Sequence, residues 1–186
     1  PTRAGQQGTT VEVLIQGNYI SDPREIVFFR PGIKAIEIKQ IEDLERPVNL
    51  AHSAEAIVQQ VTAKFVIAPD CPIGEHQFKL RTATQLSTLS TFWVTPYPIH
   101  KELEPDNTLD LNDVPEKAEV LPRETVSVFG KTDTSPQKSD VDCFRVSRKK
   151  GERISVEVDS VRLTDIHYGA SEFDLSVRIL DESGKE

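Results

Sequence analysis

The sequence predicts an all-β protein made of two strand-rich domains. Three features lead to this prediction: apolar and polar side chains alternate over most of the chain, Gly and Pro separate the alternating segments, and apolar residues at helical spacing are almost absent. Short strands separated by Gly and Pro residues are typical of β-sandwiches. Residues 97–107, which we call the seam, combine prolines with an acidic cluster and are predicted to run extended between the domains.

The first domain, residues 1–95, is expected to hold six or seven short strands. In the longest of them, Val61, Phe65 and Ile67 share one face. A polar stretch at residues 42–56 lacks the alternation and is expected to be a loop or a short turn of helix. The expected strands lie near residues 9–16, 26–29, 36–39, 57–67, 76–80 and 92–94.

A linker at residues 96–100 leads to the second domain, residues 101–186. A hairpin turn is predicted at residues 149–152 and a further turn at residues 181–184, and no strand follows the second turn. We therefore expect an incomplete sheet, whose open edge is covered by a following segment or by a partner chain. Alternating segments predict strands at residues 125–130, 140–146, 154–158 and 173–179.

Charge is distributed unevenly between the two halves of the chain. Residues 1–95 hold 9 basic and 10 acidic side chains, whereas residues 96–186 hold 13 and 20. This acidity argues against nucleic acid as a partner, because binding a phosphate backbone requires a basic face. The apolar runs are too short to cross a bilayer, so no transmembrane segment is expected. The chain begins at Pro1 and contains no Met, and we expect it to be a piece of a longer protein.

No catalytic residues are predicted. The four His residues are scattered and none belongs to an HExxH motif. The sequence contains no GxSxG nucleophile elbow, no GxGxxG and no P-loop. Cys71 and Cys143 fall in different domains, and their spacing does not suggest a zinc site. These observations favour a protein that is not an enzyme.

The seam is the one stretch that suggests a bound ion. Its oxygen-bearing side chains are spaced closely enough in an extended chain to converge on a hard cation, and an aspartate pair in the second domain would complete the set. Ligands that are all oxygen favour calcium over a softer metal. The alternative is that these side chains are solvated, or that Asp142 only caps a turn. The predicted ligands are Glu102, Glu104, Asp106, Asn107, Asp140 and Asp142.

The only Trp of the chain lies close to the seam. Trp93 and Tyr97 stand beside Pro96 and Pro98, and aromatic side chains next to prolines suggest a recognition patch for sugar or peptide. The alternative is that both aromatic residues pack against the neighbouring domain and stiffen the joint.

Turn and core positions of the first domain form a pattern that extends over nearly all of residues 1–95. It consists of Gly5-x-x-Gly8-Thr9-Thr10-Val11-x-Val13 leading to Gly17, then Val27-x-Phe29, and later Ala68-Pro69 and Gly74. This pattern resembles the immunoglobulin-like IPT/TIG domains. The resemblance implies an immunoglobulin-like β-sandwich that serves as a binding or spacer module of large surface and secreted proteins.

The second domain carries a second pattern. It consists of Glu102-x-Glu104-Pro105-Asp106-Asn107, a strand ending at Gly130, Asp140-x-Asp142-x-Phe144, Lys150-Gly151-Glu152 and Leu180-Asp181-x-x-Gly184. This pattern is similar to the opening two-thirds of a bacterial pre-peptidase C-terminal domain and implies a partial β-jelly-roll. Related collagen-binding modules of bacterial collagenases hold calcium, which implies the same role for the matching Glu102, Glu104, Asn107, Asp140 and Asp142, with Asp106 where many relatives carry Asn.

The two resemblances, together with the absence of catalytic motifs, imply a noncatalytic binding or spacer fragment of a larger bacterial protein that is secreted or belongs to the cell envelope. Its location would be extracellular, periplasmic or at the cell surface, and its partners would be other domains of the parent protein and a polysaccharide or extracellular protein. One alternative is an accessory region of a secreted peptidase or other hydrolase whose catalytic domain lies outside this chain. Another is a structural spacer in a surface array, with neither ligand nor metal.

Overall fold

A computed structural model describes residues 3–45, 58–103, 112–130, 141–158 and 175–186. The described residues up to Pro96 form one compact unit, unit 1, and those from Tyr97 onward form a second, unit 2. Almost all regular secondary structure in the described residues is strand, which confirms the prediction of an all-β protein.

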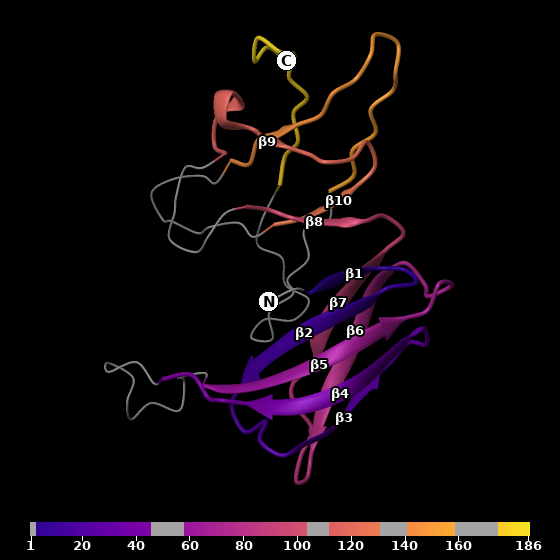
Figure 1. Cartoon of the computed structure of the whole chain (residues 1–186), viewed down its shortest axis with the longest axis vertical. Helices are drawn as coiled ribbons and strands as arrows, with labels where there is room; N and C mark the ends of the chain where they lie inside the picture. The colour runs from indigo at the N-terminus through magenta and orange to yellow at the C-terminus, as the bar shows by residue number, and fades with distance from the viewer. Residues whose placement is uncertain (1–2, 46–57, 104–111, 131–140, 159–174) are drawn as a thin grey trace. The chain divides into compact units, whose positions relative to one another are not determined.

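Unit 1 is a sandwich of two sheets (Figure 1). The four-stranded sheet has the order β1-β7-β6-β3 and consists of β1 (Ala4–Gln6), β7 (Ser90–Thr95), β6 (Gly74–Thr82) and β3 (Pro23–Phe28). The three-stranded sheet has the order β2-β5-β4 and consists of β2 (Thr10–Gly17), β5 (Gln59–Ile67) and β4 (Ile33–Ile41). Neighbouring strands are antiparallel except β1 and β7, which are parallel.

The alternation of apolar and polar residues determines which side chains form the core of unit 1. On β5 the side chains of Val61, Ala63, Phe65 and Ile67 are all buried, as predicted, and the residues between them are partly exposed. Strands β2, β6 and β7 also point alternate apolar residues inward, and Phe92 of β7 is completely buried. Each strand can bury one face because the other sheet covers it.

Four Phe rings occupy the centre of this core. The ring centroid of Phe65 lies 5.0 Å from that of Phe28, 5.4 Å from that of Phe78 and 5.2 Å from that of Phe92. All three contacts have the edge-to-face geometry that aromatic pairs prefer. The rings come from both sheets, so they join the two layers of the sandwich.

Strand β4 departs from the simple alternation expected at residues 36–39. Its pairing with β5 shifts register between Ile36 and Lys39, where Glu37 adopts a φ of 52°. Ile36 is consequently 44% exposed instead of lying in the core. Glu37 forms an ion pair with Lys64 of β5, at 2.7 Å. Because β4 lies at a sheet edge, this bulge makes the edge less suitable for pairing with another chain.

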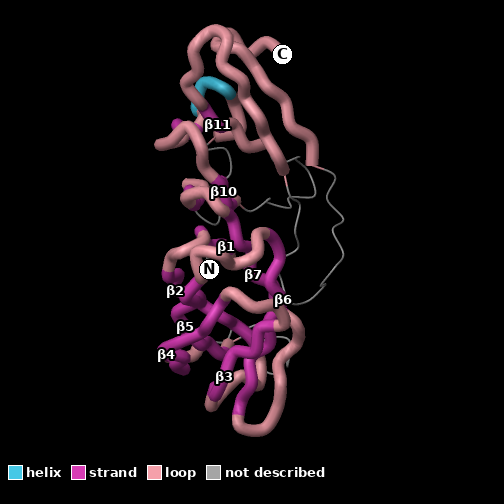
Figure 2. Tube along the Cα trace, turned by 90° about the vertical axis from the view of Figure 1, so that its right-hand side faces the viewer, coloured by secondary structure: helices cyan, strands magenta, loops and turns pink. Residues whose placement is uncertain are grey.

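Unit 2 contains shorter elements (Figure 2). β8 (Ile99–Lys101) pairs in parallel with β10 (Ser127–Phe129), and β9 (Glu119–Val120) pairs in parallel with β11 (Phe144–Arg145). A single 3₁₀ turn, η2 (Pro115–Lys117), precedes β9. Strand β8 takes up Ile99 and His100, which the sequence analysis placed in the linker. Within the described ranges, no helix has the length and apolar character needed to cross a membrane.

Most of the strands predicted for the second domain are shorter than expected or do not form in its described part. The strand expected at residues 140–146 is reduced to β11, and residues 154–158 and 175–179 form no strand. Val156 is 54% exposed and Val177 is 50% exposed. A strand is stabilised by ladder hydrogen bonds and by a covered face, and alternation alone supplies neither.

Turns form at both positions predicted in the second domain, but the first does not close the predicted hairpin, because residues 154–158 form no strand. At the first, Glu152 N donates to Lys149 O at 3.0 Å, and Gly151 has a φ of 94°. At the second, Gly184 N donates to Asp181 O at 2.9 Å. Local hydrogen bonds and glycine conformation determine such turns, so they form without support from a sheet.

Candidate functional site

The predicted cation ligands divide into two groups. Glu102 and Asp142 belong to the described residues of unit 2. The other four, Glu104, Asp106, Asn107 and Asp140, lie outside the described residues. Among the described residues, no group of three or more His, Cys, Asp or Glu side chains is arranged to hold a metal. The described part of the candidate site therefore centres on Glu102.

Glu102 is a buried carboxylate. It directly follows β8, its backbone N donates to Phe129 O at 3.1 Å, and the residue is only 6% exposed. Asn112 Nδ2 donates to Glu102 Oε1 at 3.3 Å. The carboxylate also lies against Gly130, where a Cβ would collide with Oε2. Burying a carboxylate is costly unless polar partners or a cation compensate for the lost water. A buried Glu102 therefore requires such partners or a cation.

Asn112 contributes the second buried group of the site. The residue is 5% exposed, and its Oδ1 has no hydrogen-bond partner among the described residues although it is inaccessible to water. A buried amide oxygen without a donor is rare in folded proteins. The Asn112 amide thus donates from its nitrogen to the Glu102 carboxylate and keeps an oxygen that can still accept. Carboxylate and amide oxygens are the ligands of a hard cation.

Carboxylates also surround the neighbouring Cys143. Its backbone N donates to Asn112 O at 2.9 Å, so Asp142 lies one residue away from this contact. Burial raises the pKa of the Cys143 thiol, and the negative charges of Asp142, Asp113 and Glu116 raise this pKa further. The same negative potential that disfavours a thiolate favours a bound cation.

A second polar pair fixes the backbone on both sides of Glu102. His100 Nε2 lies 2.7 Å from Glu119 Oε1, and both side chains are largely buried. Glu119 Oε2 accepts a hydrogen bond from Leu103 N at 3.2 Å. Since His100 and Leu103 lie on either side of Glu102, Glu119 fixes the backbone from which the Glu102 side chain extends.

Sequence reasoning did not identify Asn112 or Glu119. Asn112-Asp113 continues the oxygen-rich run that begins in the seam, and this continuation was the available signal. Glu119 carries no such signal, because its role depends on the contact of its side chain with that of His100, which lies on a strand of another sheet. A contact of this kind depends on tertiary structure.

The predicted aromatic patch is divided between the two units. Trp93 lies on β7 of unit 1, where its backbone N donates to Arg3 O at 2.9 Å, and its side chain is partly buried. Tyr97 is the first residue of unit 2 and is 47% exposed.

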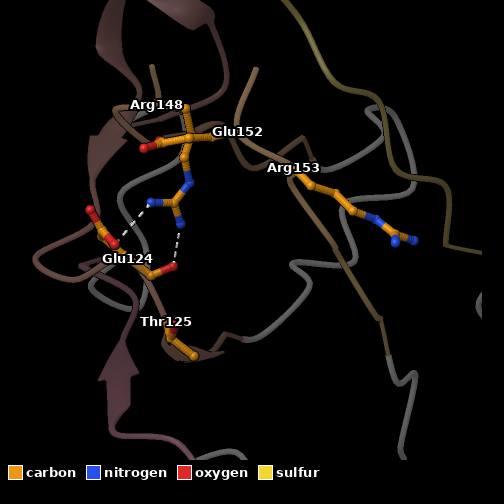
Figure 3. A pocket seen from close by; sticks show the side chains of 5 residues that line it. All are labelled: Glu124, Thr125, Arg148, Glu152 and Arg153. Atoms are coloured by element: carbon orange, nitrogen blue, oxygen red, sulfur yellow. Dashed lines mark hydrogen bonds and ion pairs between the residues drawn. The ribbon is translucent and has the colours of Figure 1, made fainter. Parts of the chain in front are cut away.

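An open depression of about 300 Å³ lies elsewhere in unit 2 (Figure 3). Arg148 extends toward Glu124, and its guanidinium contacts both the backbone O, at 2.5 Å, and the carboxylate, at 3.5 Å. Arg153 points away from this pair in the view of Figure 3. Because Arg148 already has an acidic partner, the depression does not favour an anion. Its lining residues are Glu124, Thr125, Arg148, Glu152 and Arg153.

Cys71 and His76 are brought together in unit 1. Cys71 Sγ lies 3.6 Å from His76 Nε2, and the same nitrogen lies 2.7 Å from Pro72 O. Both residues are completely or almost completely buried, and burial raises the pKa of the Cys71 thiol. The thiolate is the nucleophilic form of cysteine, so this environment does not favour covalent catalysis.

Comparison of the sequence with protein-family models and with curated proteins found no match.

Proposed function

We propose that this chain is a noncatalytic binding or spacer segment of a larger bacterial protein that is secreted or belongs to the cell envelope. The observation that supports this proposal best is the strand order of unit 1. When its strands are lettered A to G in chain order, the two sheets are B-E-D and C-F-G, with A beside G. This is close to the order of the immunoglobulin constant-type sandwich and supports the resemblance to IPT/TIG domains.

The arrangement of side chains in unit 1 also favours a binding or spacer role. Its interior is filled by apolar side chains, with the Phe cluster at the centre. A rigid sandwich of this kind presents its loops to partners at either end. The chemistry of those loops, and not the fold, decides which partner is bound.

Calcium is the cation that we propose for unit 2. Glu102 and Asn112 fit it, because both offer buried oxygen atoms and the Asn112 Oδ1 has no other donor among the described residues. The remaining ligands would come from the residues predicted with Glu102: Glu104, Asp106, Asn107, Asp140 and Asp142. Bound calcium would supply positive charge to an acidic region and would hold segments of unit 2 together.

Calcium titration followed by thermal melting tests this site. A ligand that binds only the folded state stabilises it by about 2.7 kcal/mol at 100 times its Kd, so millimolar calcium should raise the midpoint. Glu102→Gln should abolish most of the rise, while Glu182→Gln, which changes an exposed carboxylate of the same unit, should leave it intact. An unchanged midpoint in millimolar calcium would remove the metal from the proposal.

The second candidate is an accessory region of a secreted peptidase. It is favoured by the turn that begins at Asp181, where Oδ1 accepts hydrogen bonds from Ser183 N at 2.9 Å and Lys185 N at 3.0 Å. This turn matches part of the pre-peptidase C-terminal pattern, and such domains accompany peptidases. In either case the chain itself should not hydrolyse casein. Hydrolysis that a single substitution abolishes would contradict the noncatalytic role.

A further inference from the structure

One end of unit 1 carries an exposed aromatic residue on a well-fixed loop. We call this surface the Tyr19 end; it is formed by residues 18–22, between β2 and β3, by residues 83–89, between β6 and β7, and by the adjoining ends of β3, β4, β5 and β6. The two loops are joined by hydrogen bonds. Gln85 Nε2 donates to Tyr19 O at 2.7 Å, and Ala83 N donates to Asp22 O at 3.2 Å.

Tyr19 has an unfavourable backbone and an exposed side chain. Its φ is 60°, and Asp22 in the same loop has a φ of 56°. A bulky residue with positive φ is uncommon and costs stability. Burial of the ring does not compensate for this cost, because Tyr19 is 71% exposed. The next residue, Ile20, is buried in the core and anchors the loop, so the backbone holds the Tyr19 side chain at the surface.

Glutamine side chains fix this loop. Gln59 accepts a hydrogen bond from Ile20 N at 2.7 Å and donates one to Ser21 Oγ at 2.7 Å. Gln40 Oε1 accepts from Asp22 N at 3.2 Å. A primary amide has two donor hydrogens and two acceptor lone pairs, so with respect to the described residues Gln40 Nε2 and Gln85 Oε1 keep capacity for a ligand. The surface therefore combines an exposed aromatic ring on a fixed backbone with uncharged donors and acceptors.

The charged side chains at this end do not favour an anionic ligand. Arg24 is paired with Asp22 at 2.7 Å, and Arg81 is paired with Glu25 at 2.9 Å. Glu42 follows directly after β4 at the same end and adds negative charge. Phosphate groups and acidic polymers would meet no unpaired basic group among these residues.

We propose that the Tyr19 end binds a neutral polysaccharide. A sugar ring has an apolar C–H face that stacks on an aromatic ring, and its rim of hydroxyl groups pairs with uncharged amides such as Gln40 and Gln85. Because the loop is already ordered, less conformational entropy is lost on binding. This gain offsets the cost of the positive φ at Tyr19. This inference rests on the proposed binding role and specifies its ligand class and its surface.

Affinity electrophoresis of the whole chain tests the proposal. Soluble β-glucan, xylan and galactomannan are cast into native gels, and alginate serves as the anionic polymer. At least one neutral polysaccharide should retard the wild-type chain. Tyr19→Ala should weaken this binding about tenfold or more, as for a central aromatic contact, and Tyr19→Phe should retain it. Phe29→Ala, which removes a 58% exposed ring from the opposite end of unit 1, should have no effect.

Tyr19→Gly separates a loss of binding from a loss of folding. Glycine accepts a positive φ, so the thermal midpoint should stay the same or rise while retardation is lost. Retardation that persists in Tyr19→Ala, or that occurs in alginate alone, would overturn the proposal. Absence of retardation in every gel would overturn it as well but would leave the spacer role intact. Release of reducing ends by the wild-type chain would instead contradict the noncatalytic function.

Discussion

Units 1 and 2 both contain segments in which apolar and polar residues alternate, but among the described residues the apolar ones are buried only in unit 1. In unit 1 the alternating residues of β5 and β6, such as Phe65 and Phe78, are buried between two sheets. In unit 2 the alternating residues Val156 and Val177 are half exposed, and their segments form no strand. The difference shows that alternation determines which residues share a face. Whether that face becomes a core depends on a second layer that covers it.

The two units also differ in their hydrogen bonding. β5 of unit 1 has nine residues and pairs on both sides, with β2 and with β4. In unit 2, β9 and β11 have two residues each. Long ladders pair most backbone groups and make unfolding cooperative, whereas short ladders leave stability to local contacts. We therefore expect substitutions of comparable chemistry to have unequal effects in the two units.

The largest difference is expected for truncation of apolar side chains. Phe65→Ala removes a completely buried ring that contacts three other Phe rings, and it should lower the free energy of unfolding of unit 1 by about 3–5 kcal/mol. Val156→Ala in unit 2 should change stability by about 0.5 kcal/mol or less, because the side chain is already exposed.

Urea unfolding measured by tryptophan fluorescence suits the first variant, since Trp93 is the only Trp and lies in unit 1. Calorimetry measures both variants. Equal losses for Phe65→Ala and Val156→Ala would show that residues around Val156 belong to a well-packed core, which would remove the contrast between the units.

A smaller difference is expected for two glycines with similar backbones. Gly32 in unit 1 has a φ of 108° and Gly151 in unit 2 a φ of 94°, so alanine should cost about 1–3 kcal/mol at either position. At Gly32 the new Cβ would also lie 2.9 Å from the Cα of Cys71, and such overpacking costs about 1–3 kcal/mol more. At Gly151 no atom lies within 4 Å of that position. Calorimetry should show the larger loss for Gly32→Ala, and an equal loss would mean that crowding against Cys71 does not contribute.

The smallest effect concerns the turn at Asp181. The Ser183 hydroxyl and then the backbone N–H groups of Lys185 and Ser183 hold the pKa of Asp181 below its ordinary value. A depressed pKa stabilises the folded turn above the unfolded-state pKa, and this contribution is lost as the pH falls through the folded-state pKa, below about pH 4. Ser183→Ala should raise the pKa of Asp181, as measured by NMR titration of its carboxyl carbon. In the same spectra Glu37, whose pKa is lowered mainly by its hydrogen bond to Lys64, should not change.

Much of unit 1 could be predicted from the sequence because its strands obey a period of two. The face of β5 with Val61 and Phe65 follows from alternation. The bulge at Glu37 could not be predicted, because it depends on how β4 pairs with β5.

The candidate sites could be predicted only in part. Carboxylates in the seam identified Glu102 as a ligand candidate, but its burial and its contact with Asn112 result from packing between β8, residue 112 and Gly130. The Tyr19 end had no motif at all. Its main features are a positive φ at Tyr19 and glutamine contacts from several strands, such as those of Gln59 and Gln85, and neither is visible in the order of residues.

The sequence by itself determined the all-β class, the buried face of β5 and the turns at Gly151 and Asp181, because each depends on residues that are neighbours along the chain. Tertiary structure alone decided which alternating segments acquire a covering sheet, how Glu102 meets Asn112, and why Tyr19 stays at the surface. The physical reason is that burial and polar partnership are properties of surfaces brought together by folding, and residues far apart in the chain supply those surfaces.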